Sequence, residues 1–259
     1  MRVLFLGDIV GNPGRRAVRT FLPGLRQEYQ PDFILANAEN AAGGYGLTEK
    51  IAQELFSLGL DLLTSGNHIW KREFLPYLSR AERVLRPANY PEGAPGRGWA
   101  ILEKEGRKLG IVNLEGRVFM RPLRCPFRTG EELARQLRQE TPCILVDFHA
   151  EATSEKIALS WYLDGKVSAL IGTHTHVQTA DERILPGGTA YLSDAGMCGL
   201  RDGVIGMHRD QALEMYLTQV PRKLEVPKKG PVKVEGVFLE LDPATGRALR
   251  IETFRRQED

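Results

Sequence analysis

The sequence predicts an α/β fold in which two β-sheets pack against each other and helices cover their outer faces. Three observations lead to this prediction. Short apolar runs, each followed by a helix-like segment, recur through the first two thirds of the chain. A hairpin pattern interrupts them near residue 105, and a long alternating strand pattern follows near the C-terminus. With 259 residues and 42% hydrophobic content, the chain can bury a full core, and we expect a single domain spanning residues 1–259.

The first third of the chain predicts three buried strands and two helices. Pro13 and Gly14 introduce the first helix. Thr48 is the expected N-cap of the second, because a threonine hydroxyl can accept a hydrogen bond from the first helical turn. The predicted strands are residues 3–6, 33–36 and 62–64, and the predicted helices are 15–29 and 48–58.

The rest of the chain predicts a hairpin, a return of buried strands and a final strand pair. Residues 99–103 and 108–113 flank the turn Glu105-Gly106-Arg107, which is typical of an antiparallel hairpin. The later predicted elements are strands 143–148, 167–171 and 191–193, a helix 153–163, and strands 232–241 and 249–254 joined by a turn at 242–246. In α/β folds the loops at the strand ends bind ligands, so we expect function there.

Charge and cysteine content argue against several classes of protein. Lys and Arg number 35 against 33 Asp and Glu, which gives no electrostatic footprint for long nucleic-acid duplexes or anionic membranes. No stretch approaches the roughly 20 apolar residues of a membrane span, and residues 1–8 do not resemble a signal peptide. The three cysteines are widely spaced and indicate neither a disulfide framework nor a thiolate zinc site. We therefore expect a cytoplasmic protein with no membrane partner.

Residues able to bind metal follow five of the predicted strands. Four of the five histidines in the chain lie at these strand ends, and only His208 does not. A single Asp or His after a strand is usually a turn, cap or core residue. Chance does not explain why metal-binding residue types follow five strands. The set is Asp8 after the first strand, Glu39 and Asn40 after the second, Asn67 and His68 after the third, and His149, His174 and His176 after the later two.

These side chains offer oxygen and nitrogen ligands without a thiolate, which suits manganese, iron or zinc. A carboxylate such as Glu39 or Asp8 can bridge two cations about 3.5 to 4 Å apart, and such a pair holds both the attacking and the leaving oxygen of an in-line displacement. The sequence therefore predicts a site for phosphoryl chemistry. The expected cofactors are two divalent or mixed-valence metal ions per chain, with iron or manganese favoured over zinc.

The same residues resemble the five-block signature of the calcineurin-like metallophosphoesterases. The blocks are Gly7-Asp8, Glu39-Asn40, Gly66-Asn67-His68, His149 and Gly172-Thr173-His174-Thr175-His176. Longer strings resemble the bacterial branch described as 2',3'-cyclic-nucleotide 2'-phosphodiesterases, namely NAEN at 37–40, RPANYP at 86–91, VDFHAEATSEK at 146–156 and DAGM at 194–197. The resemblance spans nearly the whole chain and implies a four-layer α-β-β-α sandwich.

The resemblance also implies how the ligands are shared between two ions. Most members carry a histidine two residues after the first Asp and an Asp as bridging ligand, but Val10 and Glu39 stand at these positions here. Asn40 would replace the missing histidine. One ion would be held by Asp8, Glu39, Asn40 and His176, and the other by Glu39, Asn67, His149 and His174. Because an amide oxygen is a weaker ligand than imidazole, we expect the first ion to be the more exchangeable one.

His68 is not a metal ligand in the scheme of this family but lies beside the leaving oxygen. Neighbouring dications make hydroxide available between them at neutral pH, so the nucleophile needs no protein base. A ribose alkoxide leaves poorly without a proton, and an imidazole titrates near neutral pH. We therefore expect His68 to be the general acid. The alternative is that His68 only orients the adjacent Asn67.

The predicted function is hydrolysis of small phosphodiesters, and the resemblance implies that 2',3'-cyclic nucleotides are cleaved to 3'-phosphates. Within enzymes, the alternatives are a phosphomonoesterase or a nuclease acting on RNA ends, although the near-neutral charge disfavours long RNA as a partner. Outside enzymes, the alternative is a regulatory protein with a vestigial metal site. Intact ligands in every block argue against it. The sequence is compatible with a homo-oligomer.

Other residues near the predicted site receive simpler interpretations. The glycine-rich segment 7–14 has neither dinucleotide-binding nor P-loop spacing, and we expect its glycines to let backbone approach the metals. Segment 196–206 is glycine-rich and is expected to be a loop that contacts substrate. Asp147 is expected to support a ligand or the fold, and Glu151 to begin a helix. Cys198 has no adjacent base, which argues against a nucleophilic role.

Overall fold

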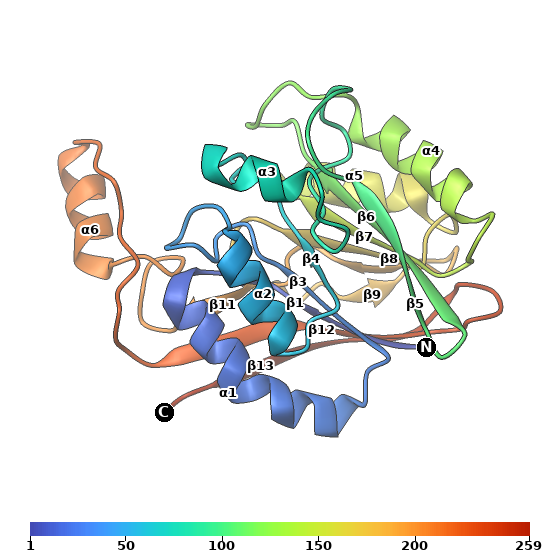
Figure 1. Cartoon of the computed structure of the whole chain (residues 1–259), viewed down its shortest axis with the longest axis horizontal. Helices are drawn as coiled ribbons and strands as arrows, with labels where there is room; N and C mark the ends of the chain where they lie inside the picture. The colour runs from blue at the N-terminus through green and yellow to red at the C-terminus, as the bar shows by residue number, and fades with distance from the viewer.

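The structure is a computed structural model that describes residues 1–259, with the side chain of Arg72 excepted. Two mixed β-sheets pack face to face, and helices cover their outer faces (Figure 1). The α/β fold class predicted from the sequence is thus confirmed.

Side-chain alternation along β1 (Arg2–Leu6) explains how the layers form. Val3 and Phe5 pack into the core between the two sheets, whereas Leu4 and Leu6 pack into the core beneath the helices. A strand that is buried on both faces is mostly apolar, which is why β1 appears in the sequence as an uninterrupted apolar run.

The first sheet contains seven strands. These are β1, β2 (Asp8–Ile9), β3 (Phe33–Asn37), β4 (Leu62–Thr64), β11 (Met197–Leu200), β12 (Val232–Leu241) and β13 (Ala248–Gln257). Their order is β2-β11-β12-β1-β3-β4. Strand β13 lies off this path and pairs with β12. Strands β1, β3 and β4 run parallel, so their carboxyl ends share one edge. Helices α1 (Gly11–Tyr29) and α2 (Glu49–Ser57) pack on the outer face.

The second sheet contains six strands. These are β5 (Trp99–Lys104), β6 (Arg107–Glu115), β7 (Ile144–His149), β8 (Ala169–Thr173), β9 (Arg183–Ile184) and β10 (Ala190–Leu192), in the order β5-β6-β7-β8-β10-β9. The predicted antiparallel hairpin is β5 and β6, and β6, β7, β8 and β10 run parallel. Helices α4 (Pro126–Leu137) and α5 (Thr153–Leu163) cover this sheet.

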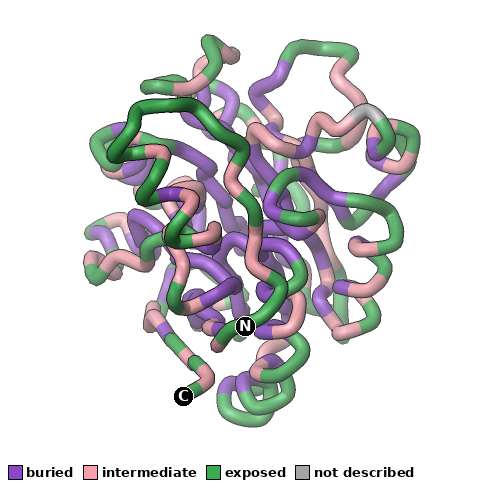
Figure 2. The backbone as a smooth tube through the Cα atoms, turned by 90° about the vertical axis from the view of Figure 1, so that its left-hand side faces the viewer, coloured by how far each residue is buried: buried purple, intermediate pink, exposed green. Residues whose placement is uncertain are grey.

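Three separate apolar cores lie between the four layers. One lies between α1, α2 and the first sheet, one between the sheets, and one between the second sheet and α4 with α5. Figure 2 shows the buried segments gathered inside the molecule, with exposed segments on the outer helices and loops. The four-layer α-β-β-α arrangement implied by the family resemblance is therefore present.

Several elements differ from the sequence prediction. Helix α1 begins at Gly11 rather than at residue 15. Helix α4, a short helix α3 (Leu75–Leu78) with a preceding 3-10 turn η1 (Arg72–Phe74), and α6 (Arg209–Thr218) were not predicted. The first part of the expected loop 196–206 is strand β11, which pairs with β2 and β12.

Two glycines of segment 7–14 allow close packing of the backbone against strand β11. A Cβ atom on Gly7 would collide with the backbone carbonyl of Gly196, and one on Gly14 would collide with the carbonyl of Cys198. These glycines therefore allow the strand β11 backbone to lie against the start of the chain.

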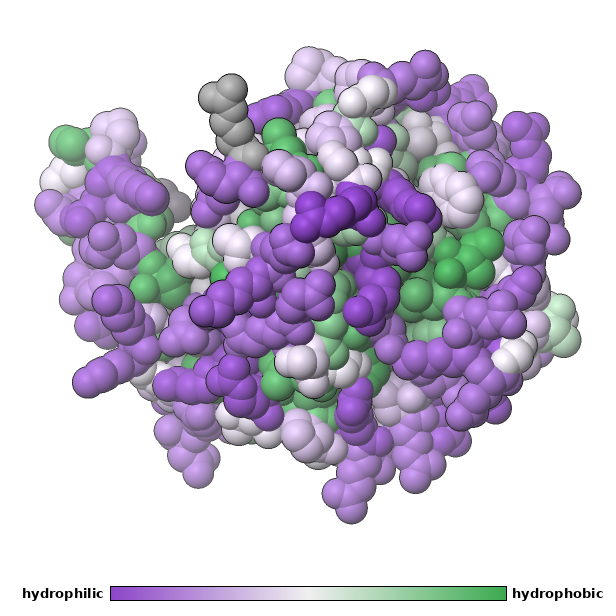
Figure 3. Space-filling model, viewed as in Figure 1, coloured by the Kyte–Doolittle hydropathy of each residue, from purple (hydrophilic) through white to green (hydrophobic). Residues whose placement is uncertain are grey.

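The surface in Figure 3 is largely hydrophilic, with scattered apolar side chains. Helix α6 projects from the body of the molecule in Figure 1 and carries exposed Leu213, Tyr216 and Leu217. Among the residues that the structure describes, no helix combines the length and apolar character needed to cross a bilayer.

Candidate metal centre

All eight residues predicted for the site lie together at one edge of the sandwich. The loops after β3 and β4 bring Glu39, Asn40, Asn67 and His68 there from the first sheet, and Asp8 lies in β2 beside them. The ends of β7 and β8 bring His149, His174 and His176 from the second sheet. The two sheets therefore contribute to a single cluster of side chains.

Glu39 lies at the centre of this cluster and is fully buried. Its Oε1 is 3.1 Å from His149 Nε2 and 3.2 Å from His68 Nδ1, and its Oε2 accepts a 2.9 Å hydrogen bond from the His68 backbone N–H. Burial disfavours charge on Glu39, but the neighbouring His149 and His68 outweigh it and hold the pKa of the carboxyl well below its usual value. Glu39 is thus an anion that both histidines share.

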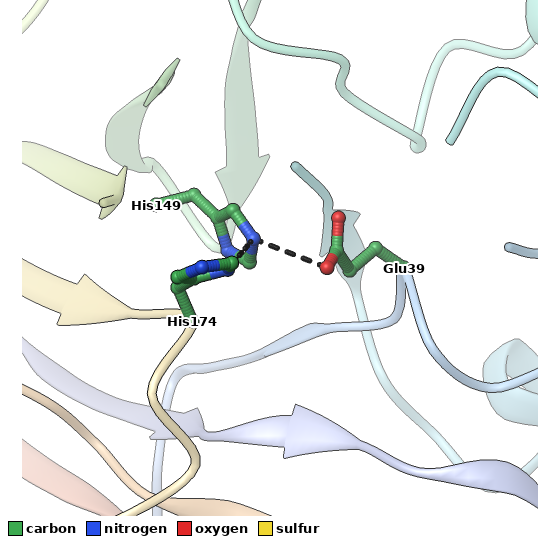
Figure 4. A group of neighbouring side chains, drawn as sticks. All are labelled: Glu39, His149 and His174. Atoms are coloured by element: carbon green, nitrogen blue, oxygen red, sulfur yellow. Dashed lines mark hydrogen bonds and ion pairs between the residues drawn. The ribbon is translucent and has the colours of Figure 1, made fainter. Parts of the chain in front are cut away.

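The first group of ligand-type atoms surrounds His149 Nε2. Glu39 Oε1 lies 3.1 Å from it, Asn67 Oδ1 lies 3.2 Å from it, and His174 Nδ1 lies 3.0 Å from it. Figure 4 shows the Glu39, His149 and His174 side chains facing one another. Potential ligand atoms of these three residues all lie within 4.8 Å of one another.

Hydrogen bonds fix the orientation of the His149 and His174 imidazole rings. In each ring, the nitrogen that points away from the group of ligand-type atoms has a hydrogen-bond acceptor beside it. Thr173 Oγ1 donates to Asp147 at 2.7 Å, so it accepts from His149 Nδ1 at 2.9 Å. His174 Nε2 likewise faces the Glu151 carboxylate at 3.0 Å. A proton on the far nitrogen leaves the lone pair of the near nitrogen pointing inward. When His149 is neutral, four acceptor atoms converge without a donor, an arrangement that fits a cation.

The pKa values of the two rings follow from the same surroundings. Burial, together with the charge of His149, lowers the pKa of His174 to about 3, so its ring is neutral at neutral pH. Burial also disfavours charge on His149, but the carboxylate of Glu39 outweighs it and raises the pKa of His149 to about 9. A proton and a cation would therefore compete for the same atoms of His149 and Glu39.

The second group of ligand-type atoms surrounds His176 Nε2. Asp8 Oδ1 lies 3.6 Å from it, and the Asn40 side-chain nitrogen lies 3.2 Å from it. His176 Nδ1 donates a 2.9 Å hydrogen bond to the Ile205 carbonyl, which fixes the ring with Nε2 facing inward. Asp8 and Asn40 are buried.

The Asn40 amide is turned the opposite way from a metal ligand. Its nitrogen faces Glu39 and His176, each at 3.2 Å, while its oxygen accepts a 2.7 Å hydrogen bond from His68 Nδ1. Ligation through oxygen requires a 180° rotation of the amide group, which exchanges two atoms of similar size. The Asn67 oxygen needs no such rotation, because it already faces His149.

A strained loop presents the last two histidines. His174 and His176 have φ angles of 102° and 64°, a region that side chains other than glycine adopt at a cost of roughly 1–3 kcal/mol each. Asp194 anchors the loop by accepting hydrogen bonds from the Thr175 backbone N–H at 3.0 Å and hydroxyl at 2.8 Å. Lys156, which is almost fully buried, pairs with Asp194 at 3.0 Å.

Sequence reasoning did not identify Asp194 and Lys156 as supports of this loop. Asp194 begins the DAGM string and Lys156 ends the string at 146–156, but these strings do not indicate that the two side chains contact each other. Glu151, expected only as a helix-start residue, also contacts His174. Neither motif string revealed which residue its charged side chain would contact.

The remaining residues of interest lie around the site rather than in it. Asp147 is buried and bonds Thr173 and Asn37, which is the supporting position expected for it. Cys198 is buried beneath the cluster, and burial raises the pKa of its thiol far above the usual value. Arg201 pairs with its neighbour Asp202 and bonds the carbonyl of Glu258, so these two charges have partners of their own.

The chain is similar to proteins of a known family along nearly its whole length. The model of the YmdB-like protein family matches residues 4–254. The chain is 47% identical over 260 residues to the 2',3'-cyclic-nucleotide 2'-phosphodiesterase of Bacillus subtilis (strain 168), and the match covers 100% of this chain and 98% of that protein.

Two solved structures extend the comparison. A crystal structure described as a novel phosphatase of Mycoplasma pneumoniae has a TM-score of 0.93 at 36% identity, covering 100% of this chain and 94% of that one. The NAD nucleotidase of Haemophilus influenzae has a TM-score of 0.63 at 15% identity, covering 99% of this chain and 55% of that one. The second match shows a shared fold and nothing more.

Proposed function

The chain belongs to the YmdB-like protein family, and from this we propose that it is a metal-dependent phosphodiesterase that hydrolyses 2',3'-cyclic nucleotides to nucleoside 3'-phosphates. The observation that carries the proposal is the convergence of acceptor atoms around Glu39 and His149, which fits a cation. The name of the Bacillus subtilis relative, 47% identical over its near-complete length, supports the substrate class.

Two metal ions per chain would be held by the residues of the two groups. Asp8, Asn40 and His176 would hold one ion, Asn67, His149 and His174 the other, and Glu39 would bridge both. When bound, such ions lower the pKa of water toward neutrality and neutralise phosphate charge. The set contains only oxygen and nitrogen ligands, and we favour iron or manganese over zinc.

His68 would deliver the proton to the leaving oxygen. Its Nδ1 is bound within the cluster, by the Asn40 oxygen at 2.7 Å and near Glu39 Oε1 at 3.2 Å. Its side chain is 29% exposed, in contrast to the buried Glu39 beside it. Nε2, the nitrogen on the other side of the ring, is therefore the atom that we assign to proton donation. An alkoxide leaving group requires such a donor.

The direction of cleavage follows from which oxygen receives that proton. Protonation of the ribose 2'-oxygen as it leaves produces a 3'-phosphate, whereas protonation of the 3'-oxygen produces a 2'-phosphate. We propose that the substrate binds with its 2'-oxygen beside His68. The cyclic phosphate is small, which agrees with a nearly balanced count of 35 basic and 33 acidic residues.

The test is a substrate panel assayed with the purified protein and added manganese. The panel contains the four 2',3'-cyclic nucleotides, a nucleoside monophosphate and a short RNA that ends in a 3'-phosphate. We expect turnover of the cyclic nucleotides, with the 3'-phosphate isomer identified by ³¹P NMR. Exclusive formation of the 2'-phosphate would overturn the direction of cleavage. Turnover of the monoester alone would favour the phosphatase alternative, and no turnover of any ester would favour the regulatory one.

A further inference from the structure

We infer that Tyr45 is a stacking platform for the nucleobase of the substrate, placed beside His68 at the mouth of the metal centre. This inference rests on the proposed function and extends it from the phosphate to the base. It assigns a recognition role to a side chain that the proposed metal ligands and proton donor leave unused.

The Tyr45 ring lies directly against the imidazole of His68. Its ring centroid lies 4.3 Å from that of His68, with the two planes inclined at 41°. Tyr45 nevertheless keeps 48% of its surface exposed. An aromatic ring that is half exposed beside a proposed proton donor offers a surface on which a flat ligand can stack.

The loop that carries Tyr45 holds it in a defined place. Ala42 donates a backbone hydrogen bond to the Gly46 carbonyl at 2.9 Å, and Gly44 donates one to the Asn40 carbonyl at 3.0 Å. Gly44 and Gly46 adopt φ angles of 88° and 80°, which side chains rarely accept. Gly44 also packs against Val226, where a Cβ atom would not fit. The ring is therefore positioned before any ligand arrives, which lowers the entropic cost of binding.

The connectivity of the substrate puts the base close to the oxygen that His68 would protonate. In a nucleoside 2',3'-cyclic phosphate, the 2'-oxygen is attached to C2', and the neighbouring C1' carries the base. A donor that protonates the 2'-oxygen therefore has the base within a few bonds of the leaving atom. An aromatic ring in contact with that donor can reach the base, whereas it would be farther from it if the 3'-oxygen were leaving.

Lys71 adds a cation at the edge of this platform. Its Nζ lies 5.4 Å from the Tyr45 ring centroid, and its carbon stem crosses Gly46, where a Cβ atom would overlap it. Lys71 Nζ donates a long hydrogen bond of 3.5 Å to the Ala42 carbonyl. Partial burial, together with the nearby charge of Lys223, lowers the pKa of Lys71. An ammonium on a flexible stem can move to meet acceptor atoms of a stacked base.

Binding and turnover together test the inference. Binding is measured by calorimetry on the manganese-loaded protein, with adenosine 3'-monophosphate and with inorganic phosphate. Turnover is measured with 2',3'-cyclic AMP and with glycerol 1,2-cyclic phosphate, which has the same cyclic ester and no base. The variants are Tyr45→Ala, Tyr45→Phe, and Tyr216→Ala as an exposed control on α6.

We expect Tyr45→Ala to weaken adenosine 3'-monophosphate binding and to raise KM for 2',3'-cyclic AMP by about 5- to 100-fold, the range of a lost base–aromatic contact. Phosphate binding and turnover of the glycerol ester should change by less than about 2-fold, within ordinary surface-mutation effects. Tyr45→Phe, which retains the ring, should retain most of the affinity. Tyr216→Ala should resemble the unmodified protein.

Three results would overturn the inference. Equal losses of turnover on both cyclic esters, with kcat rather than KM changed, would mean that Tyr45 only supports His68. Unchanged adenosine 3'-monophosphate binding in Tyr45→Ala would remove the stacking contact. A loss in Tyr45→Phe as large as in Tyr45→Ala would assign the effect to the hydroxyl. Absence of cyclic-nucleotide turnover in the unmodified protein would instead count against the proposed function, and the binding measurements would still decide on Tyr45.

Discussion

His68 Nδ1 and the side-chain oxygen of Asn40 lie 2.7 Å apart, so the orientation of one group fixes the proton position of the other. With the amide oxygen facing His68, Nδ1 must carry a proton. If the amide rotates to present its oxygen to a cation, its nitrogen faces His68, and Nδ1 accepts from it once the cations hold Glu39 Oε1, which lies 3.2 Å from Nδ1. Nε2 of a neutral His68 then carries the proton, on the side away from Glu39. Metal ligation by Asn40 would in this way prepare the proposed proton donor.

Replacement of His68 by asparagine separates proton donation from metal binding. His68→Asn should retain both metals and slow 2',3'-cyclic AMP hydrolysis by ~10²- to 10⁴-fold, the usual contribution of general acid catalysis. Nitrophenolate leaves without a proton, so bis(4-nitrophenyl) phosphate hydrolysis should fall clearly less. The comparison uses steady-state kinetics on both substrates, with metal content measured in parallel. Equal losses with metals retained would assign His68 to substrate positioning.

The ligand assignment predicts distinct metal contents for three variants. Glu39→Gln should lower occupancy of both sites, because Glu39 contacts both groups of ligand atoms. Asn67→Ala should empty mainly the site that contains His149, and Asn40→Ala mainly the other. Elemental analysis after gel filtration measures the ions per chain, with about two expected in the unmodified protein. Identical contents in the three variants would contradict a bridging role for Glu39.

The buried pair of Lys156 and Asp194 predicts a large effect on stability. Lys156→Met leaves the Asp194 carboxylate buried without its cation, and loss of one partner of a buried pair typically costs about 3–5 kcal/mol of unfolding free energy. Lys166→Met removes a partner of the surface residue Glu131 and should change stability little. Thermal unfolding of both variants, monitored by circular dichroism, provides the comparison. Similar melting temperatures for the two would show that the Asp194 carboxylate is stabilised by its other hydrogen bonds.

The three cysteines should differ in reactivity. Burial raises the pKa of the Cys143 thiol to about 11 and that of Cys198 further, so neither forms a thiolate at pH 8. Cys125 is partly exposed. Iodoacetamide at pH 8 should therefore modify at most Cys125 in the folded protein and all three cysteines in guanidinium chloride, as read by mass spectrometry. Rapid modification of native Cys198 would indicate that β11 opens in solution.

The strands of the core were predicted well because most are apolar at nearly every position, as in β1 and β3. Elements that form only because they pack on or pair with other elements were not predicted from the sequence. Gly130 lies inside α4 and lowers its helix propensity, but it lets the helix approach Leu114 and Leu163 closely. Strand β11 contains Gly199 and follows Gly196, so its sequence is typical of a loop, and only pairing with β2 and β12 makes it a strand.

For the candidate site, the chain positions of the ligand-type residues were predictable because strand ends of parallel sheets meet at one edge. The supports were not predictable, since they depend on contacts between distant segments. Asp194 follows the carboxyl end of β10 and accepts hydrogen bonds from Thr175. The Ile205 carbonyl lies in a turn after β11 and accepts a hydrogen bond from His176. Neither contact has a sequence pattern of its own. The exposure of Tyr45 beside His68 likewise required the three-dimensional arrangement.

Because the ligand-type residues come from both sheets, a bound ion would hold the two sheets together. Asp8, Glu39 and Asn67 belong to the first sheet, and His149 and His174 to the second. An ion held between them would add a link between two layers that already meet through apolar packing and through hydrogen bonds such as that from Asn37 to Asp147. Separation of the sheets at this edge would then require release of the ion. The rate at which a chromogenic chelator captures metal from the folded protein would therefore set an upper limit on how often the sandwich opens there.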